Sequence, residues 1–201
     1  MIVALGSGPL QQFLVIFLMK WGYLAASSLL EMRMQRSVSI IGNTMKEHAM
    51  QHFDTPGSVE VTVRLPVGSR VEATAAAAGF RGVGRLGEVS YEATQGLVKL
   101  DESAGARLAV QDGDITIGRL TGPARVETAK GDIRIDEAVR GELVLRTRAG
   151  GISVTAAAGV SASLDAGTSY GRIDNALRND GTTGLDIRAT TAHGDITARS
   201  R

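Results

Sequence analysis

Aspartates follow a recurring glycine at three places in the chain, and carboxylates in a regular array are the ligands that hard cations prefer. The three are Asp114, Asp132 and Asp195. Calcium-binding rolls collect several oxygens per ion by repeating glycine and aspartate about every nine residues, whereas here each repeat brings one aspartate. The corresponding position elsewhere is held by Leu97, Gly151 and Arg172. Aspartate in a turn usually accepts hydrogen bonds from nearby backbone N–H groups, so we predict a structural role and no metal site.

The histidines give no better candidate for a metal site. His48 and His52 are four residues apart and would share a helical face, but they have no third ligand, and KEHAMQH is not the HExxH of zinc proteases. His193 precedes Gly194 at an expected turn, where simple exposure is the best interpretation. The chain has no cysteine, which excludes disulfides and thiolate metal sites. We therefore expect no metal and no cofactor.

A charged face is the remaining candidate for catalysis, since β-helical enzymes that cleave acidic polysaccharides gather such residues on one outer sheet. Five residues could share a face here: Arg125, Glu127, Asp132, Arg134 and Arg146. Charged outer faces are, however, normal for a soluble solenoid, and aromatic residues, the usual platforms for sugars, make up only 4% of the chain. Tyr91 and Tyr170 are expected to be packed or at corners. We predict no catalytic residue and no enzymatic activity.

A column of threonines has two interpretations. Thr128, Thr147, Thr168 and Thr191 recur at one offset from a glycine, and a flat, exposed threonine array can order water in ice-binding solenoids. Those arrays repeat Thr-x-Thr on a single face. Here the threonines share the parity of the apolar residues two positions earlier, such as Val126, so we expect them to point inward or to lie at corners.

These residues must be positioned by a repeat that runs through most of the chain. Each unit is a short alternating strand, a Gly-Asp or Gly-Gly turn, and a second strand such as Ile-x-Ile. The marker glycines are Gly96, Gly113, Gly131, Gly150, Gly171 and Gly194, spaced 17, 18, 19, 21 and 23 residues apart. Two residues after them stand Val98, Ile115, Ile133, Ile152, Ile173 and Ile196. Apolar and polar residues alternate on both sides of the glycine, which is the period of a strand.

Units of this length are too short for a crossover helix, so successive units should pair in parallel, coil upon coil. One unit cannot bury its inner face alone, but stacked units can. We therefore predict an all-β fold: a single-stranded parallel β-solenoid (β-helix) of about seven coils of 17–23 residues, in which Ala78–Phe80 is a degenerate first turn. An antiparallel β-sandwich with accidental similarity is the alternative. The 25 glycines among 201 residues agree with turn-dense β structure.

Residues 1–50 lack both the two-residue period and the marker glycine. We expect them to be an N-terminal hydrophobic extension, helical or disordered, and residues 51–201 to be the β-solenoid domain. The window Leu10–Leu30 is long enough to span a membrane. Lys20 lies near its centre, however, where a charge costs about 2.5–3.5 kcal/mol, and no basic flank precedes it as a signal peptide would require.

Several segments together resemble a bacterial family of β-strand repeats. They read GSVEVTVRLPVGSRVEA, GRLGEVSYEATQGLVKLDE, GPARVETAKGDIRIDEAVRG, GVSASLDAGTSYGRIDNAL and ATTAHGDITARS. The family is catalogued under adhesins, as domain of unknown function 4097, and the resemblance, to its actinobacterial type, covers about Phe53 to Arg201. It implies a β-helical fold, no established enzymatic activity and no catalytic residues to transfer. Members often have further strands after FDTP, whereas here Phe53–Pro56 runs directly into Gly57.

The function that these patterns favour is a non-enzymatic scaffold or interaction module, adhesin-like, with an unknown protein or envelope partner. The alternatives are a carbohydrate-active β-helix enzyme, or a membrane-tethered envelope-stress protein if residues 10–30 are an anchor. The net charge of +1 gives no bulk attraction to nucleic acid or anionic lipid, so we expect no nucleic-acid partner and membrane contact only through residues 10–30. We expect a cytoplasmic protein, in which uncapped sheet edges would allow end-to-end self-association.

Overall fold

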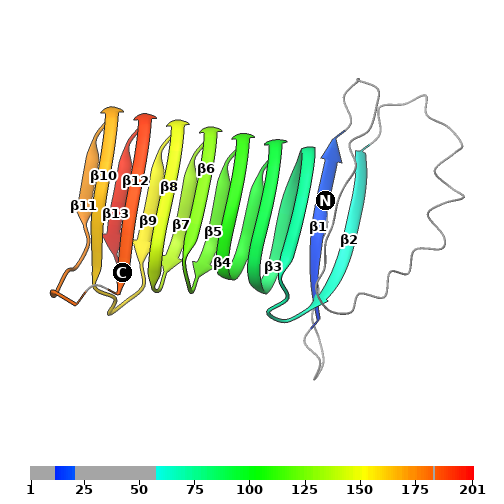
Figure 1. Ribbon diagram of the computed structural model, residues 1–201, viewed down its shortest axis with the longest axis horizontal. Coiled ribbons are helices and arrows are strands. Elements are labelled where there is room, and N and C mark those ends of the chain that lie inside the picture. The colour runs from blue at the N-terminus through cyan, green and yellow to red at the C-terminus, as the bar shows by residue number, and fades with distance from the viewer. Residues whose placement is uncertain (1–11, 21–57, 183) are drawn as a thin grey trace, which may run out of the picture.

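The computed structural model describes residues 12–20, 58–182 and 184–201, and these form a rod of β-strands without a helix (Figure 1). The strands are β1 (Gln12–Lys20), β2 (Ser58–Pro66), β3 (Val71–Gln95), β4 (Val98–Asp112), β5 (Ile115–Leu120), β6 (Ala124–Lys130), β7 (Ile133–Ala138), β8 (Gly141–Ala149), β9 (Ile152–Ala156), β10 (Ala162–Tyr170), β11 (Ile173–Ala176), β12 (Leu185–His193) and β13 (Ile196–Ser200).

Two parallel sheets face each other along the rod. The first runs β3–β4–β6–β8–β12–β10 and the second β3–β4–β5–β7–β9–β13–β11; β3 and β4 belong to both because each turns the corner between them. About six turns of the chain stack in this way (Figure 1). The predicted all-β, single-stranded parallel β-solenoid is therefore confirmed. Ala78 holds the first marker position, since Phe80 pairs with Val98, which confirms the degenerate first turn.

The core consists of stacked columns, each one residue wide. The column two residues after the marker glycine contains Val98, Ile115, Ile133, Ile152 and Ile196, and each of them is at most 1% exposed. The parallel register places each of them directly on the next, as in Ile115 on Ile133. Burying apolar area in this way stabilises the fold by about 25 cal/mol per Å², and it is available only when coils stack.

The marker glycines let successive coils approach backbone to backbone. Gly113 has a φ of +156°, and a Cβ atom there would lie 1.9 Å from the carbonyl oxygen of Gly96 in the preceding coil. The same close approach recurs one coil later, where a Cβ at Gly131 would lie 2.3 Å from the carbonyl oxygen of Gly113. Any side chain at this position would force two coils apart.

The last two coils do not follow chain order. β12 lies between β8 and β10, and β13 lies likewise between β9 and β11. The chain therefore places β10 and β11 as the outermost coil and then returns to insert β12 and β13 beneath them (Figure 1). The expectation that successive units stack coil upon coil holds as far as β9 and is wrong for the final two units.

Asn175 provides a physical reason for this inversion. It stands four residues after its marker glycine, in the column that holds Ile135, Val154 and Ala198 in other coils. In chain order Asn175 would be enclosed between Val154 and Ala198, and a buried amide without a partner costs about 1–3 kcal/mol. In the outermost coil Asn175 is exposed, and its Oδ1 accepts a hydrogen bond from the N–H of Leu177 at 3.1 Å.

Engineered disulfides distinguish the two coil orders, because the chain has no cysteine of its own. Thr197 pairs directly with Ser153, and Asp174 lies one strand beyond Thr197. One strand spacing of about 4.8 Å suits a disulfide, whereas two spacings exceed its Cα limit of about 7 Å. We expect Ser153→Cys with Thr197→Cys to close an intramolecular bond, seen as faster migration on non-reducing gels. Ser153→Cys with Asp174→Cys should stay reduced, and the reverse pattern would mean that the coils stack in chain order.

The N-terminal strand requires a second correction. Residues 12–20 form β1, which is antiparallel to both β2 and β3 and sets Phe17 opposite Phe80, so the expectation of a helical or disordered extension is wrong for them. QFLVIFLMK is rich in aromatic and β-branched residues, which favour strands, and the first coil offers it an edge. The rest of residues 1–50 lies outside the described residues. Where the chain is described, no helix is long and apolar enough to cross a membrane.

Candidate functional site

The aspartates of the turns form a ladder that joins neighbouring coils. Asp114 Oδ1 accepts from the N–H of Asp132 at 2.9 Å, and Asp132 Oδ1 accepts from the N–H of Gly151 at 2.7 Å. Asp195 Oδ1 accepts from the N–H of Arg172 at 2.8 Å in the outermost coil. Each carboxylate thus holds the next coil rather than its own turn. Within residues 12–20, 58–182 and 184–201, no group of three or more His, Cys, Asp or Glu could hold a metal ion.

This ladder leads to a prediction about calcium. Because the Asp132 carboxylate already binds the N–H of Gly151, we expect millimolar Ca²⁺ and an excess of chelator to give the same melting temperature. Asp132→Ala should lower stability by about 1–2 kcal/mol, since a charged acceptor of a backbone N–H is lost. Thermal denaturation followed by circular dichroism measures both effects. A rise of several degrees with Ca²⁺ would require an ion that binds only the native state.

The threonine column has a parallel structural role, which agrees with the expectation that it points inward. Thr147 Oγ1 donates to the carbonyl oxygen of Gly131 at 3.1 Å, and Thr191 Oγ1 donates to that of Gly150 at 3.0 Å. Both side chains are buried. Each hydroxyl therefore donates a hydrogen bond to the carbonyl oxygen of the marker glycine in the neighbouring coil. These threonines do not form a flat array that faces solvent.

The histidines and tyrosines do not form a catalytic cluster among the described residues. His48 and His52 lie outside those residues. His193 is exposed and its ring stacks on that of Tyr170 with centroids 5.0 Å apart. Tyr91 is fully buried, and its hydroxyl donates to the carbonyl oxygen of Ala78 at 2.7 Å. Burial raises the pKa of Tyr91 well above its ordinary value, so it acts as a neutral packing residue.

The five charged residues predicted to share a face are divided by the glycine turn. Arg125 and Glu127 lie on β6 and Arg146 on β8, so these three share the outer face of the first sheet. Arg134 lies on β7 in the second sheet, and Asp132 lies in the turn between the sheets. The expectation of a single face is therefore wrong for these last two, because the marker glycine carries the chain from one sheet to the other.

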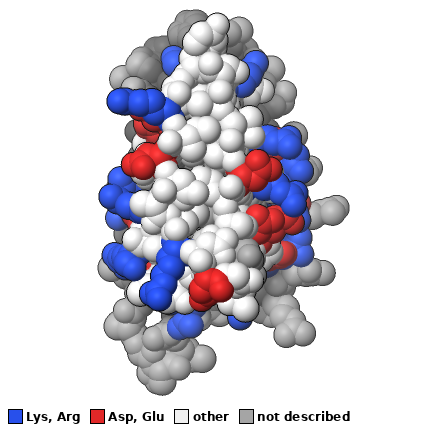
Figure 2. Space-filling view, turned by 90° about the vertical axis from the view of Figure 1, so that its left-hand side faces the viewer, with Lys and Arg blue, Asp and Glu red and all other residues white. Residues whose placement is uncertain are grey.

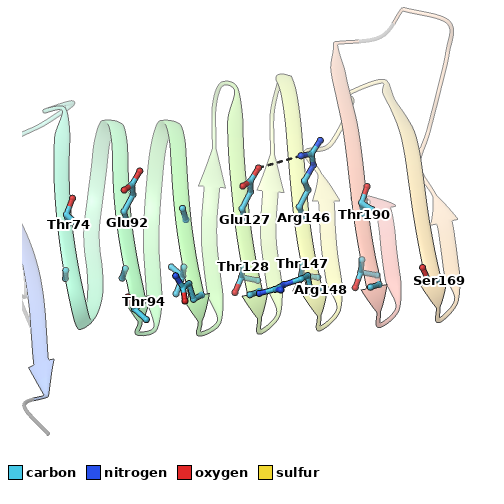
Figure 3. Close-up of a pocket in the computed structure, with 18 residues that line it drawn as sticks. Thr74, Glu92, Thr94, Glu127, Thr128, Arg146, Thr147, Arg148, Ser169 and Thr190 are labelled. Carbon is cyan, nitrogen blue, oxygen red and sulfur yellow. Dashed lines mark ion pairs between the residues drawn. The ribbon is translucent and has the colours of Figure 1, made fainter. Parts of the chain in front are cut away.

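A shallow groove of about 750 Å³ runs along the outer face of the first sheet (Figure 3). It crosses the strands from β3 to β10, and its lining contains small, uncharged polar and charged residues. The small residues include Ala109, Ala129 and Ala192, and the charged ones are Glu92, Glu127, Arg146 and Arg148. These side chains stand two and four residues before a marker glycine. Glu127 and Arg146 were predicted to share a charged face, whereas Glu92 and Arg148 were not, because their columns carry no single residue type.

The groove has an acidic half and a basic half. Glu92 and Glu127 lie toward β3, and Arg146 and Arg148 come from β8 (Figure 3). Glu127 Oε1 is 2.8 Å from Nη2 of Arg125 and 3.9 Å from Nη1 of Arg146. Neither Glu92 nor Arg148 forms an ion pair with another residue of the described part of the chain. Their charges are therefore available to a ligand that lies along the groove.

A family model described as Toastrack DUF4097 matches residues 25–201, which is most of the chain. No curated protein and no solved structure matches. The family agrees with the resemblance that the repeat segments suggested, and its fold agrees with the β-solenoid seen here. Because the match covers well over half of the sequence, this chain belongs to the Toastrack DUF4097 family.

Proposed function

We propose that this protein is a non-enzymatic β-solenoid scaffold or interaction module, and that the groove on its first sheet is the binding surface. The observation that carries the proposal is a row of ionic and small side chains held on a rigid ladder. Backbone pairing between coils fixes the lining positions, such as Arg146 and Arg148 on β8, so the surface needs no ordering when a partner binds. A preformed surface of this kind lowers the entropic cost of association.

The chemistry of the groove favours binding over hydrolysis. Glycosidases need two carboxyl groups that are free to act as an acid and as a base or nucleophile. The groove has two carboxylates, Glu92 on β3 and Glu127 on β6. Glu127 is already engaged by two arginines. No Trp, Tyr or Phe lines the groove to stack on a sugar ring.

A carbohydrate-active β-helix enzyme is the second candidate, because two carboxylates do line one groove. Incubating the protein with an acidic polysaccharide and measuring reducing ends separates the two functions. The binding module releases none. Hydrolysis that disappears in Glu127→Gln and persists in Arg134→Gln, on the other sheet, would establish the enzyme.

Site-specific photo-crosslinking tests the proposed surface. A photoreactive residue at Ala129 lies in the groove, and one at Ser153 lies on the outer side of the second sheet as a matched control. In extracts of the native organism we expect a discrete adduct from position 129 and none from position 153. The adduct should weaken in Arg148→Glu, which reverses an unpaired groove charge. Equal labelling at both positions would reject the groove as the binding surface.

The compartment belongs to the same proposal. We place the protein in the cytoplasm, with attachment through residues 10–30 as the alternative. Alkaline extraction of a membrane fraction decides between them: a cytoplasmic protein is recovered with the soluble material, whereas an anchored one stays in the pellet.

A further inference from the structure

The outermost coil leaves the core of the rod open at one end. Ile173 on β11 is 46% exposed, whereas Ile196, its neighbour in the same column, is 1% exposed. Tyr170, at the end of β10, is 71% exposed. Leu164 is only partly covered. An edge strand also leaves the N–H and C=O groups of alternate residues unpaired, so β10 and β11 together present both apolar side chains and hydrogen-bonding backbone.

The opposite end of the rod does not match this one. There β1 and β2 add antiparallel strands next to β3, whereas each coil contact inside the rod is parallel. The outermost coil also offers no aspartate to a further parallel coil. In three of the contacts between coils an aspartate such as Asp132 binds the N–H of the next coil, whereas Arg172 holds that position in the outermost coil. Head-to-tail stacking of copies is therefore disfavoured.

Most of the open end is uncharged. Figure 2 views the molecule onto this end and shows an uncharged band along its upper and middle part, with acidic and basic side chains on both sides and further charged side chains within the band near its lower end. A partner selected by charge would need a field of one sign. A surface that is uncharged at its centre and mixed at its rim can instead meet a copy of itself without opposing like charges at the centre.

We propose that two copies of this chain join through these ends about a two-fold axis, with β10 against β10 and β11 against β11 of the second copy. A two-fold axis that crosses the rod perpendicular to its strands reverses the direction of every strand, so each edge strand meets its own copy in the antiparallel orientation. An axis at the level of Ala166 and Asn175 sets Asn175 against its own counterpart. It also sets Ile173 against Leu177 of the second copy. A buried pair of asparagines can satisfy each other's amides and fix one register.

The contact is small, which sets the expected affinity. The end of a rod two sheets thick, with sheets about 10 Å apart, offers a few hundred Å² per copy, below the roughly 800 Å² of a standard interface. The dimer should therefore be weak, and its population should depend on protein concentration. This inference concerns the end of the rod and is independent of the groove proposed above.

A single cysteine tests the symmetry directly, because the chain has none. In the full chain, Asn175→Cys places one thiol at the proposed axis, where Cα atoms of opposed antiparallel residues lie about 4.5–5.5 Å apart, within disulfide range. Mild oxidation should give a covalent dimer on non-reducing gels, and Ser153→Cys on the side of the rod should give none. Equal crosslinking of the two variants would overturn the two-fold contact.

Sedimentation velocity of the unmodified chain provides the second measurement. We expect the dimer fraction to rise with concentration between about 10 and 500 µM. Ile173→Lys, a change at an exposed position, should shift the equilibrium to monomer at least tenfold while leaving the circular dichroism spectrum unchanged. A monomer at all concentrations would overturn the proposal. So would oligomers that persist in Ile173→Lys, since they would use another surface.

Discussion

Ile133→Asp is expected to unfold the domain. Ile133 is 1% exposed and lies between Ile115 and Ile152 in the most regular column of the core. A carboxylate at this position would have only aliphatic neighbours along the column. Burying an unpaired charge costs several kcal/mol, which is comparable with the total stability of a domain, about 5–15 kcal/mol. The far-ultraviolet signal of β structure should be lost at room temperature.

Arg134→Asp is the matched control, because it introduces the same side chain one residue away. Arg134 points outward and pairs with Asp136, with both side chains about half exposed. Exposed ion pairs contribute about 0–1 kcal/mol, so the variant should change stability by less than about 1 kcal/mol. Thermal melts of the two variants measure the difference. Equal melting temperatures would mean that the inward and outward parity of β7 is misassigned.

The columns could be predicted from the sequence because they repeat a local rule in every coil. A β-branched residue two positions after each glycine, and a threonine three before, recur often enough to identify two strands and a turn without knowledge of distant contacts. The inward direction of Thr147 followed from the same parity. Periodicity of this kind is a property of the strand itself, which explains why the fold class and the core were accessible.

The coil order and the groove were harder to predict from the sequence, since both depend on contacts between units. Parallel pairing has the same register whether Ile196 or Ile173 follows Ile152, so the columns cannot by themselves rank the two orders. The one signal was Asn175, a polar residue at a core offset, which marks the coil that must stay outermost. The groove arises from side chains of several coils, such as Glu92 on β3 and Arg148 on β8, which line one surface only because the coils stack.

Gly113→Ala is expected to destabilise the domain almost as strongly as a buried charge does, although it adds only a methyl group. The new Cβ would lie 1.9 Å from the carbonyl oxygen of Gly96 and 2.8 Å from its carbonyl carbon, and the φ of +156° is one that side chains rarely adopt. The backbones of Gly113 and Gly96 are both held in place by the ladder that fixes the coil spacing. The N–H of Gly113 donates to the carbonyl oxygen of Lys130 at 2.8 Å, and the N–H of Gly96 donates to that of Asp112 at 3.0 Å.

Relief of this clash requires two coils to separate and their ladder hydrogen bonds to lengthen. We therefore expect the free energy of unfolding to fall by at least about 3–4 kcal/mol, as it does for substitutions that cause a specific steric or packing fault. Gly167→Ala is the control: it is a glycine on the exposed face of β10, and a Cβ there would have no atom within 4 Å. That variant should change stability by less than about 0.5 kcal/mol. Urea denaturation of both proteins gives the comparison. A small loss at Gly113 would show that the coils can move apart, and the marker glycine would then reflect turn formation rather than contact between coils.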